Sequence, residues 1–106
     1  MDINPILVTS TFPTKEEAEK TAKLLVSKKL AVCVNIIGPV ISYYEWENKI
    51  QNDEEYKLFI KTLESKWPDI KKTIKENHPY TVPEISKLLI NDILEEYYSW
   101  MKNILA

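Results

Sequence analysis

The sequence predicts an α+β domain with the ferredoxin-like split β-α-β arrangement, in which a βαββαβ core is followed by a C-terminal helix. Three observations lead to this class. The chain has 106 residues, which suits one compact domain over residues 1–106. Apolar residues alternate between strand-like and helix-like spacing along the chain. The two middle strand-like segments are consecutive and long, which predicts an extended antiparallel hairpin.

The first strand and helix are expected within residues 6–29. Residues 6–11 form a short β-branched run between two prolines, which predicts a strand. Thr14 and Glu17 then form a Thr-x-x-Glu capping box, so a helix is expected to begin there. Apolar residues recur at helical spacing as far as Val26. The helix is expected to end near Lys28 or Lys29, whose charges suit the negative end of the helix dipole.

The hairpin is expected to extend from residue 30 to residue 63. Residues 30–37 and 40–46 alternate between two faces and are interrupted by Gly38. We interpret them as one strand with a bend or bulge, because glycine tolerates the backbone geometry that bulges use. Asn48 is the residue of the following turn that is best able to adopt a positive φ. The chain then returns antiparallel through residues 50–63.

The remaining elements are a helix, a strand and a last helix. Ser65 is the N-cap candidate for the second helix, which has Pro68 in its first turn and is expected to stop before Pro79. Residues 85–90 predict the fourth strand. Asp92 is the expected cap of the C-terminal helix.

The scarcity of certain residue types excludes several kinds of chemistry. The chain has one Gly, one Cys and one His, and all 14 of its basic residues are Lys. A single Gly excludes Gly-rich phosphate loops, and a single Cys excludes an intrachain disulfide or a cage of cysteines around a metal. No Ser/His/Asp order or nucleophile elbow is present, so an enzyme is not expected. No apolar run approaches the ~20 residues of a membrane-spanning helix, so no membrane association is expected.

The predicted hairpin carries aromatic or apolar residues on both faces, although helices cover only one face of such a sheet. An aromatic sheet face left open would exceed the apolar patch that soluble monomers usually expose. Self-association through the hairpin explains this pattern, and a stacking platform for single-stranded nucleic acid is the alternative. The net charge of −2 and an acidic cluster near the hairpin end would repel phosphate, so no nucleic acid is expected; the cluster comprises Glu45, Glu47, Asp53, Glu54 and Glu55.

A series of motifs from Val8 to about Trp100 resembles the CutA family of divalent-cation tolerance proteins. The matching residues are Ala31-Val32-Cys33-Val34-Asn35-Ile36-Ile37, Ser42-x-Tyr44-x-Trp46-x-x-Lys49-Ile50, Glu55, Lys61-Thr62 and His78-Pro79-Tyr80-x-Val82-Pro83-Glu84-Ile85. The resemblance implies a ferredoxin-like subunit in a homotrimer, whose hairpins pair between subunits. It also implies an association with copper and other divalent cations, and no enzymatic activity.

The sequence departs from the family pattern at four positions. Asn48 stands where a Gly is common, and Thr81 stands where Glu or Gln is common. Some family members have a Cys and a second His where this chain has Ser10 and Asn77. A metal site that needs those two ligands is therefore weakened here.

Three residues are candidate metal ligands. His78 is the only imidazole and could bind copper or zinc near a subunit boundary, or it could be a helix-end histidine held by a backbone hydrogen bond. Glu84 could be an oxygen ligand, or it could pair with Lys61 or another Lys. Cys33 could supply a thiolate, or it could be a small apolar residue of the strand. One His per chain cannot form a closed four-ligand site, so binding is expected to be weak or shared between chains.

Four further residues are expected at an interface or cleft between subunits. Tyr44, Trp46 and Tyr80 are interpreted as interface packing rather than as a cofactor site, and Lys61 is expected to lie near Tyr80 and Glu84.

The predicted function is that of a trimeric cytoplasmic protein in the response to metal ions. It would bind Cu(II) or another divalent cation and require no cofactor. The alternative is a trimeric module similar to the PII signalling proteins, which senses a ligand or anchors a partner and binds metal only incidentally. The missing Arg and Gly-rich loops argue against nucleotide sensing by the PII route.

Overall fold

The computed structural model describes residues 4–105, and it has the predicted α+β class and element order. Four strands form one antiparallel sheet in the order β2-β3-β1-β4. Strands β1 and β2 are therefore parallel with β3 between them, and β3 and β4 are parallel with β1 between them. The elements are β1 (Pro5–Phe12), α1 (Lys15–Ser27), β2 (Cys33–Trp46), β3 (Lys49–Leu63), the 3-10 turn η1 (Glu64–Lys66), α2 (Trp67–Asn77), β4 (Ile85–Leu89) and α3 (Glu95–Leu105).

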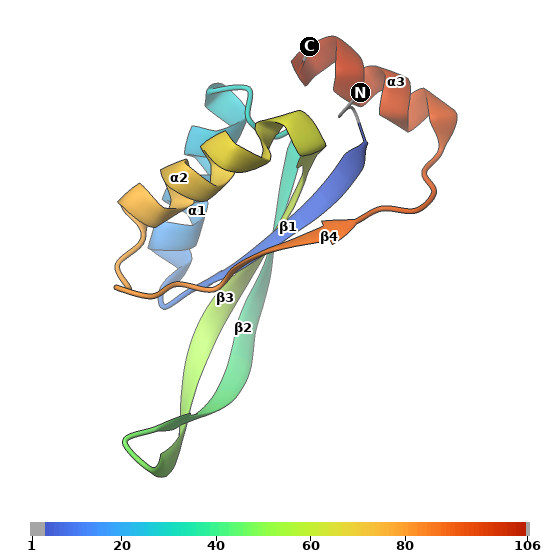
Figure 1. The fold of residues 1–106 in the computed structure, drawn as a ribbon. Coiled ribbons are helices and arrows are strands. Elements are labelled where there is room, and N and C mark those ends of the chain that lie inside the picture. The colour runs from blue at the N-terminus through green and yellow to red at the C-terminus, as the bar shows by residue number, and fades with distance from the viewer. Residues whose placement is uncertain (1–3, 106) are drawn as a thin grey trace.

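The main core lies between the sheet and the helices α1 and α2, which cover the same face (Figure 1). Ile6, Val8 and Phe12 alternate along β1 and are fully buried there. Leu58 and Ile60 of β3 face the same core. This alternation follows from the period of two along a strand, which sends every second side chain to the helices.

The other face of the sheet, here called the open face, carries Leu7, Ile37, Phe59 and Leu88. These residues alternate with the core residues of their strands and lie on the side that α1 and α2 leave uncovered. Helix α3 lies at one end of the molecule and packs on a second small core around Val32, Leu63, Met101 and Leu105. Within residues 4–105, no helix is long and apolar enough to cross a membrane.

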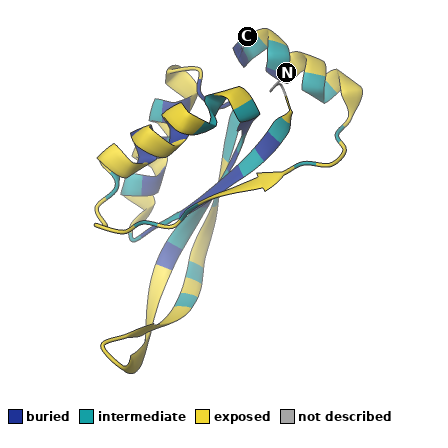
Figure 2. Cartoon of the chain, in the orientation of Figure 1, coloured by how far each residue is buried: buried dark blue, intermediate teal, exposed yellow. Residues whose placement is uncertain are grey.

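The hairpin of β2 and β3 projects from the body of the protein, as Figure 1 shows, and gives the molecule a length of 46 Å. We call residues 40–55 the hairpin arm. Figure 2 shows that this arm is mostly exposed. Its turn is Glu47–Asn48, with φ of 53° and 65°, so the positive φ expected of Asn48 is confirmed. The two faces of the arm are as predicted: Ile41 and Tyr43 lie on one, and Tyr44 and Trp46 lie on the other.

The predicted irregularity at Gly38 is confirmed, although its physical reason differs from the one expected. The register between β2 and β3 shifts between Ile37 and Val40. Gly38 does not have a positive φ. Instead, there is no space for a side chain at this position. A Cβ atom there would lie 2.5 Å from Cδ2 of Tyr56 and 3.0 Å from the carbonyl oxygen of Glu55.

The helix ends are partly as predicted. The Thr14 hydroxyl accepts a hydrogen bond from the Glu17 amide at 3.2 Å and donates one to the Glu17 carboxylate, so the capping box is confirmed. The expectation for Ser65 was wrong, because this residue lies inside η1 and α2 begins at Trp67 without a side-chain cap. The expectation for Asp92 was also wrong. Its carboxylate accepts from the amide of the next residue, Ile93, and α3 begins only at Glu95.

The second strand starts later than expected, at Cys33 rather than residue 30. Residues 30 and 31 instead close the end of α1, because both of their amides donate to the carbonyl of Leu25. Lys29 has a positive φ of 56°, as is common just after a helix.

Substitution of Gly38 by Ala tests the close approach of β2 to Tyr56. We expect Gly38→Ala to lower the free energy of unfolding by about 1–3 kcal/mol, because the added methyl group must displace Tyr56 or the β3 backbone. Denaturant unfolding at one fixed protein concentration measures this change. Glu45→Ala, on the exposed part of the same strand, is the control and should change stability by no more than about 0.5 kcal/mol. Equal stability of Gly38→Ala and the wild type would contradict the steric explanation.

Candidate functional site

A hollow on the open face lies between the hairpin arm and the segment that leads into β4. It forms because β1 ends at Phe12, opposite Tyr56, whereas β3 continues for the length of the arm. We call this hollow the arm groove; its volume is about 750 Å³. The side chains of Tyr44, Trp46, Asp53, Glu55, Tyr80 and Glu84 contribute its aromatic and acidic lining. Three of the expected interface or cleft residues, Tyr44, Trp46 and Tyr80, are thus brought together in one chain.

Two tyrosine–carboxylate pairs organise the groove. The Tyr80 hydroxyl donates to Oε2 of Glu55 at 2.8 Å, and the Tyr44 hydroxyl donates to Asp53. Burial raises the pKa of Tyr80 well above its ordinary value, and the hydrogen bond to Glu55 and the charges of Glu55 and Asp53 raise it further. The hydrogen bond to Asp53 is the main cause that raises the pKa of Tyr44. Both phenols therefore stay protonated and remain donors at neutral pH.

Glu55 is the most unusual charged residue of the groove, because only 8% of it is exposed. Within the described part of the chain it is the only buried residue with an ionisable carboxyl, and it has no ion pair there. Its hydrogen-bond donor, the Tyr80 hydroxyl, is neutral. A buried carboxylate without a cation is costly, so this side chain is a position where a positive charge would be favourable.

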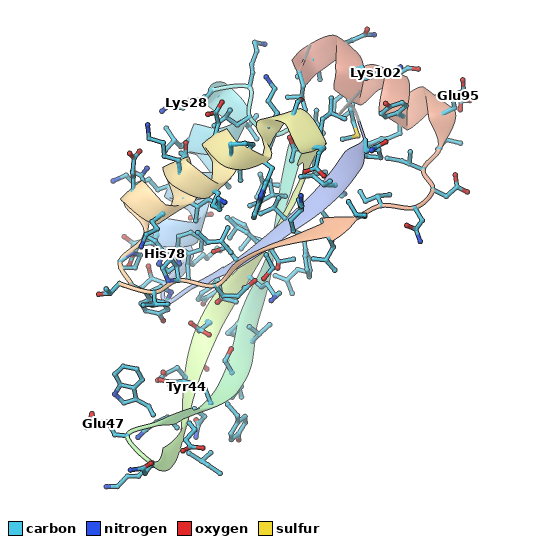
Figure 3. All side chains as sticks on the ribbon, in the orientation of Figure 1. Lys28, Tyr44, Glu47, His78, Glu95 and Lys102 are labelled. Atoms are coloured by element: carbon cyan, nitrogen blue, oxygen red, sulfur yellow. The ribbon has the colours of Figure 1, made fainter. Side chains whose placement is uncertain are left out.

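His78 follows the last residue of α2 and has an extended backbone, as expected of a residue before proline. Its Nε2–H donates to the Thr11 carbonyl at 2.7 Å, and its Nδ1 accepts from the Tyr80 amide at 3.1 Å. The ring also stacks on Phe12, with 4.3 Å between the ring centroids. The interpretation of His78 as a helix-end histidine held by the backbone is therefore confirmed, and both of its ring nitrogens are engaged. Figure 3 shows His78 near the end of α2, away from the turn of the arm at Glu47.

Glu84 lies at the rim of the groove and is held by three partners. Its Oε2 accepts from the hydroxyls of Thr9 at 2.9 Å and Ser86 at 2.7 Å. Its Oε1 lies 3.7 Å from Nζ of Lys57. The expected ion pair of Glu84 with a lysine is thus present, and its partner is Lys57 rather than Lys61.

Cys33 and Lys61 lie apart from the groove. They are neighbours in the register of β2 and β3, and Lys61 also pairs with Leu7 of β1. Thr11, which holds His78, is four residues further along β1, roughly 13 Å at the ordinary rise of a strand. The side chain of Cys33 packs beside α3, against the second core. The structure therefore does not bring Cys33 together with His78 and Glu84, or Lys61 together with Tyr80.

Considered alone, one chain offers little for a chelated metal ion. No group of three or more His, Cys, Asp or Glu side chains within residues 4–105 has the proximity to hold one. What the arm groove can do chemically is attract a positive charge, because its lining contains carboxylates and no lysine or histidine.

Sequence reasoning missed the separate role of Glu55 within the acidic cluster. The cluster was considered as a whole, as negative charge that would repel phosphate. The alternation along β3 places Glu55 and Asp53 on the face of the groove and Glu54 on the opposite face, and this signal was available in the sequence. The contact of Glu55 with Tyr80, 25 residues later in the chain, was not.

Comparison with known proteins gives a consistent result over nearly the whole chain. Residues 6–104 match the model of the CutA1 divalent ion tolerance protein family. The divalent-cation tolerance protein CutA of Pyrococcus horikoshii is 41% identical over 91% of this chain and 93% of its own length. The chloroplastic protein CutA of Arabidopsis thaliana is 42% identical over 92% of this chain, which spans only about half of that relative, 54%.

A solved structure gives the same similarity in three dimensions. The CutA of Archaeoglobus fulgidus, described as a periplasmic divalent cation tolerance protein, superposes with a TM-score of 0.93 at 36% identity, over 96% of this chain and 99% of that one. Relatives are thus described as chloroplastic and periplasmic, and the family does not determine one compartment.

Removal of the Tyr80 hydroxyl tests its role as the donor to buried Glu55. We expect Tyr80→Phe to lower the free energy of unfolding by about 1–2 kcal/mol, because a buried carboxylate loses its hydrogen bond. Denaturant unfolding at a fixed protein concentration measures the loss. Tyr43→Phe is the matched control, since Tyr43 lies on the opposite face of the arm and is 71% exposed. An equal effect of the two substitutions would show that the Tyr80–Glu55 contact contributes nothing.

Proposed function

Because the chain belongs to the CutA1 divalent ion tolerance family, we propose that it acts in the response to divalent metal ions as a homotrimer of ferredoxin-like subunits. Cu(II) is the proposed cation, bound weakly, and the proposal includes no catalysis and no required cofactor. The cytoplasm is the proposed compartment. Its support is the free Cys33, which suits a reducing environment.

The apolar residues left on the open face and the arm support the trimer. Ile37 on the open face is 46% exposed, and Ile41, Tyr43 and Trp46 on the arm are more than 60% exposed. Apolar surface of this extent is typical of residues that pack against another chain. In a homotrimer the arm of each subunit would cover part of its neighbour, which removes this surface from water.

The mass in solution tests the trimer, and a matched pair of variants tests the surface. We expect light scattering to give three times 12.4 kDa for the wild type. Ile37→Lys should lower this mass towards that of one chain, because it adds a charge to the proposed interface. Val26→Lys is the control, since Val26 is similarly exposed, at 44%, but lies on α1. A monomeric wild type would contradict the trimer, and equal masses of the two variants would contradict the role of the open face.

The proposed copper ligands are His78 and Glu84, and their common anchorage to β1 is the observation that favours them. His78 is bonded to the carbonyl of Thr11 and Glu84 to the hydroxyl of Thr9, two residues away on the same strand. An imidazole and a carboxylate are suitable ligands for Cu(II). Binding is proposed to be weak because each of these groups must give up a present partner. Cys33 is left outside this pair because it lies at the other end of the sheet.

Calorimetric titration with Cu(II) tests the two ligands. We expect His78→Ala and Glu84→Gln each to weaken Cu(II) binding about tenfold, because each removes one of few ligands. Glu84→Gln keeps acceptor capacity towards Thr9 and Ser86, so it remains informative if His78→Ala is poorly folded. Glu76→Gln, on the exposed side of α2, is the control and should bind like the wild type. Equal binding by all four proteins would remove His78 and Glu84 from the proposed site.

A second candidate function is ligand sensing or partner anchoring by a PII-like trimer, and the arm groove is the observation that favours it. The groove is of the size that small ligands occupy, and Tyr80 and Glu84 both line it. Lys61 does not, so a ligand in this groove would meet a lining without basic residues.

A further inference from the structure

Two charged side chains on one face of β3 have no oppositely charged partner within the described part of the chain. Glu55 is buried, lines the arm groove and has no ion pair there. Lys61 is half-buried and makes neither an ion pair nor a side-chain hydrogen bond within residues 4–105. Folding thus removes both groups from part of their water without supplying an opposite charge, which is costly.

Lys61 lies in the middle of the open face. Its register partners are Leu7 of β1 and Cys33 of β2, so β3 carries it between two neighbouring strands. Leu7 and Phe59 are apolar residues of the same face. A neighbouring subunit that covers this face would remove further water from the Lys61 ammonium group, which then needs a carboxylate from that subunit.

Glu55 of the same chain cannot be this carboxylate. The two residues are six positions apart on β3 and share a face, because side chains alternate along a strand. The ordinary rise of a strand places them roughly 20 Å apart. The two side chains together do not span this distance. Glu55 and Lys61 can therefore pair only between two copies of the chain.

The carboxylate of Glu55 has one oxygen free for such a partner. Its Oε2 accepts from the Tyr80 hydroxyl, and no donor within residues 4–105 reaches its Oε1. In the described part of the chain, Oγ of Ser10 is the only fully buried side-chain oxygen or nitrogen without a partner. Oε1 of Glu55 is therefore not sealed off, and an ammonium group that enters the groove can reach it.

The other lysines of β3 are less suitable partners. Lys57 is already paired with Glu84, at 3.7 Å. Lys49 lies beside the turn of the arm and is exposed, so water solvates its charge. Of the lysines of β3, Lys61 alone combines partial burial with the lack of a partner.

We propose that Glu55 in the arm groove of one subunit pairs with Lys61 of the partner subunit, so that each groove of the homotrimer is completed by its neighbour. This inference rests on the proposed homotrimer and names a contact that holds it together. The contact joins two different patches of identical chains, and contacts of this kind close into rings. In a closed ring every Glu55 and every Lys61 is paired. The groove then contains a lysine, which the lining from a single chain lacks.

Zero-length coupling with a carbodiimide tests this contact on the wild-type protein. The reagent joins a lysine amine to a carboxylate in contact with it, by forming an amide with loss of water. We expect covalent dimers and trimers on a denaturing gel, with a Glu55–Lys61 link in their peptides by mass spectrometry. This link joins two chains, because the residues are roughly 20 Å apart within one. Lys61→Met should abolish the link, and Lys49→Met, on the same face of β3, should leave it unchanged.

The affinity between subunits gives a second measurement, by sedimentation equilibrium. Lys61→Met should raise the dissociation constant at least about tenfold, because a buried carboxylate loses its cation, whereas Lys49→Met should not change it. Glu55→Gln should act like Lys61→Met, and the double variant should add little, since both substitutions remove the same pair. Lys61→Met decides if Glu55→Gln folds poorly.

The outcomes separate this contact from the trimer itself. A trimeric wild type without the Glu55–Lys61 link, or equal affinities of Lys61→Met and Lys49→Met, would overturn the inference and leave the trimer standing. A monomeric wild type in light scattering would overturn both.

Discussion

The antiparallel pairing of β1 with β3 ends at Phe12 and Tyr56, whereas β3 continues to Lys49 beyond it. Up to that point β3 is covered on its inner face by the helices, and past it the hairpin has no third strand. Phe12 is fully buried and closes the core, and His78 stacks on it from the end of α2. The arm groove, the His78 contact with Thr11 and the burial of Glu55 all lie within a few residues of this end of β1.

The position of Glu55 one residue beyond that boundary gives the groove its electrostatic character. Tyr56 next to it faces the core, and the absent Cβ of Gly38 lets β2 approach both residues. Glu55 is buried and its carboxylate accepts from the Tyr80 hydroxyl, with no lysine among the residues that line the groove. The Tyr80 hydroxyl stabilises this carboxylate by its hydrogen bond. Glu54, the next residue, is exposed on the other face of β3 and takes no part in the groove.

Local sequence signals predicted the fold well, because each element has its own start or stop. The capping box of Thr14 and Glu17, the turn at Asn48 and the stop before Pro79 depend on neighbours in the chain, and the structure confirms all three. The predicted helix caps at Ser65 and Asp92 were both wrong. A residue of the capping type does not begin a helix by itself: Ser65 lies inside a 3-10 turn, and the Asp92 carboxylate accepts from the amide of the next residue. The site was predicted in part. Tyr44, Trp46 and Tyr80 line one groove of a single chain, and their expected place at a cleft between subunits stays a prediction. The burial of Glu55 and the separation of Lys61 from Tyr80 depend on the register of β1 with β3, which no local pattern encodes.

The proposed copper site conflicts with contacts that the chain already makes, and this conflict follows from the small number of possible ligands in the chain. With one His, one Cys and no Arg, the chain cannot build a metal cage from its own residues, and His78 already uses both ring nitrogens to hold Thr11 and Tyr80. A metal ion at His78 therefore competes with contacts that maintain the wall of the groove. Copper binding at Nδ1 of His78 would release the amide of Tyr80, whose side chain holds Glu55. Copper binding and the Tyr80–Glu55 hydrogen bond are thus expected to be coupled through Tyr80. By linkage, a contact that favours the present position of this residue weakens a ligand that needs its amide released.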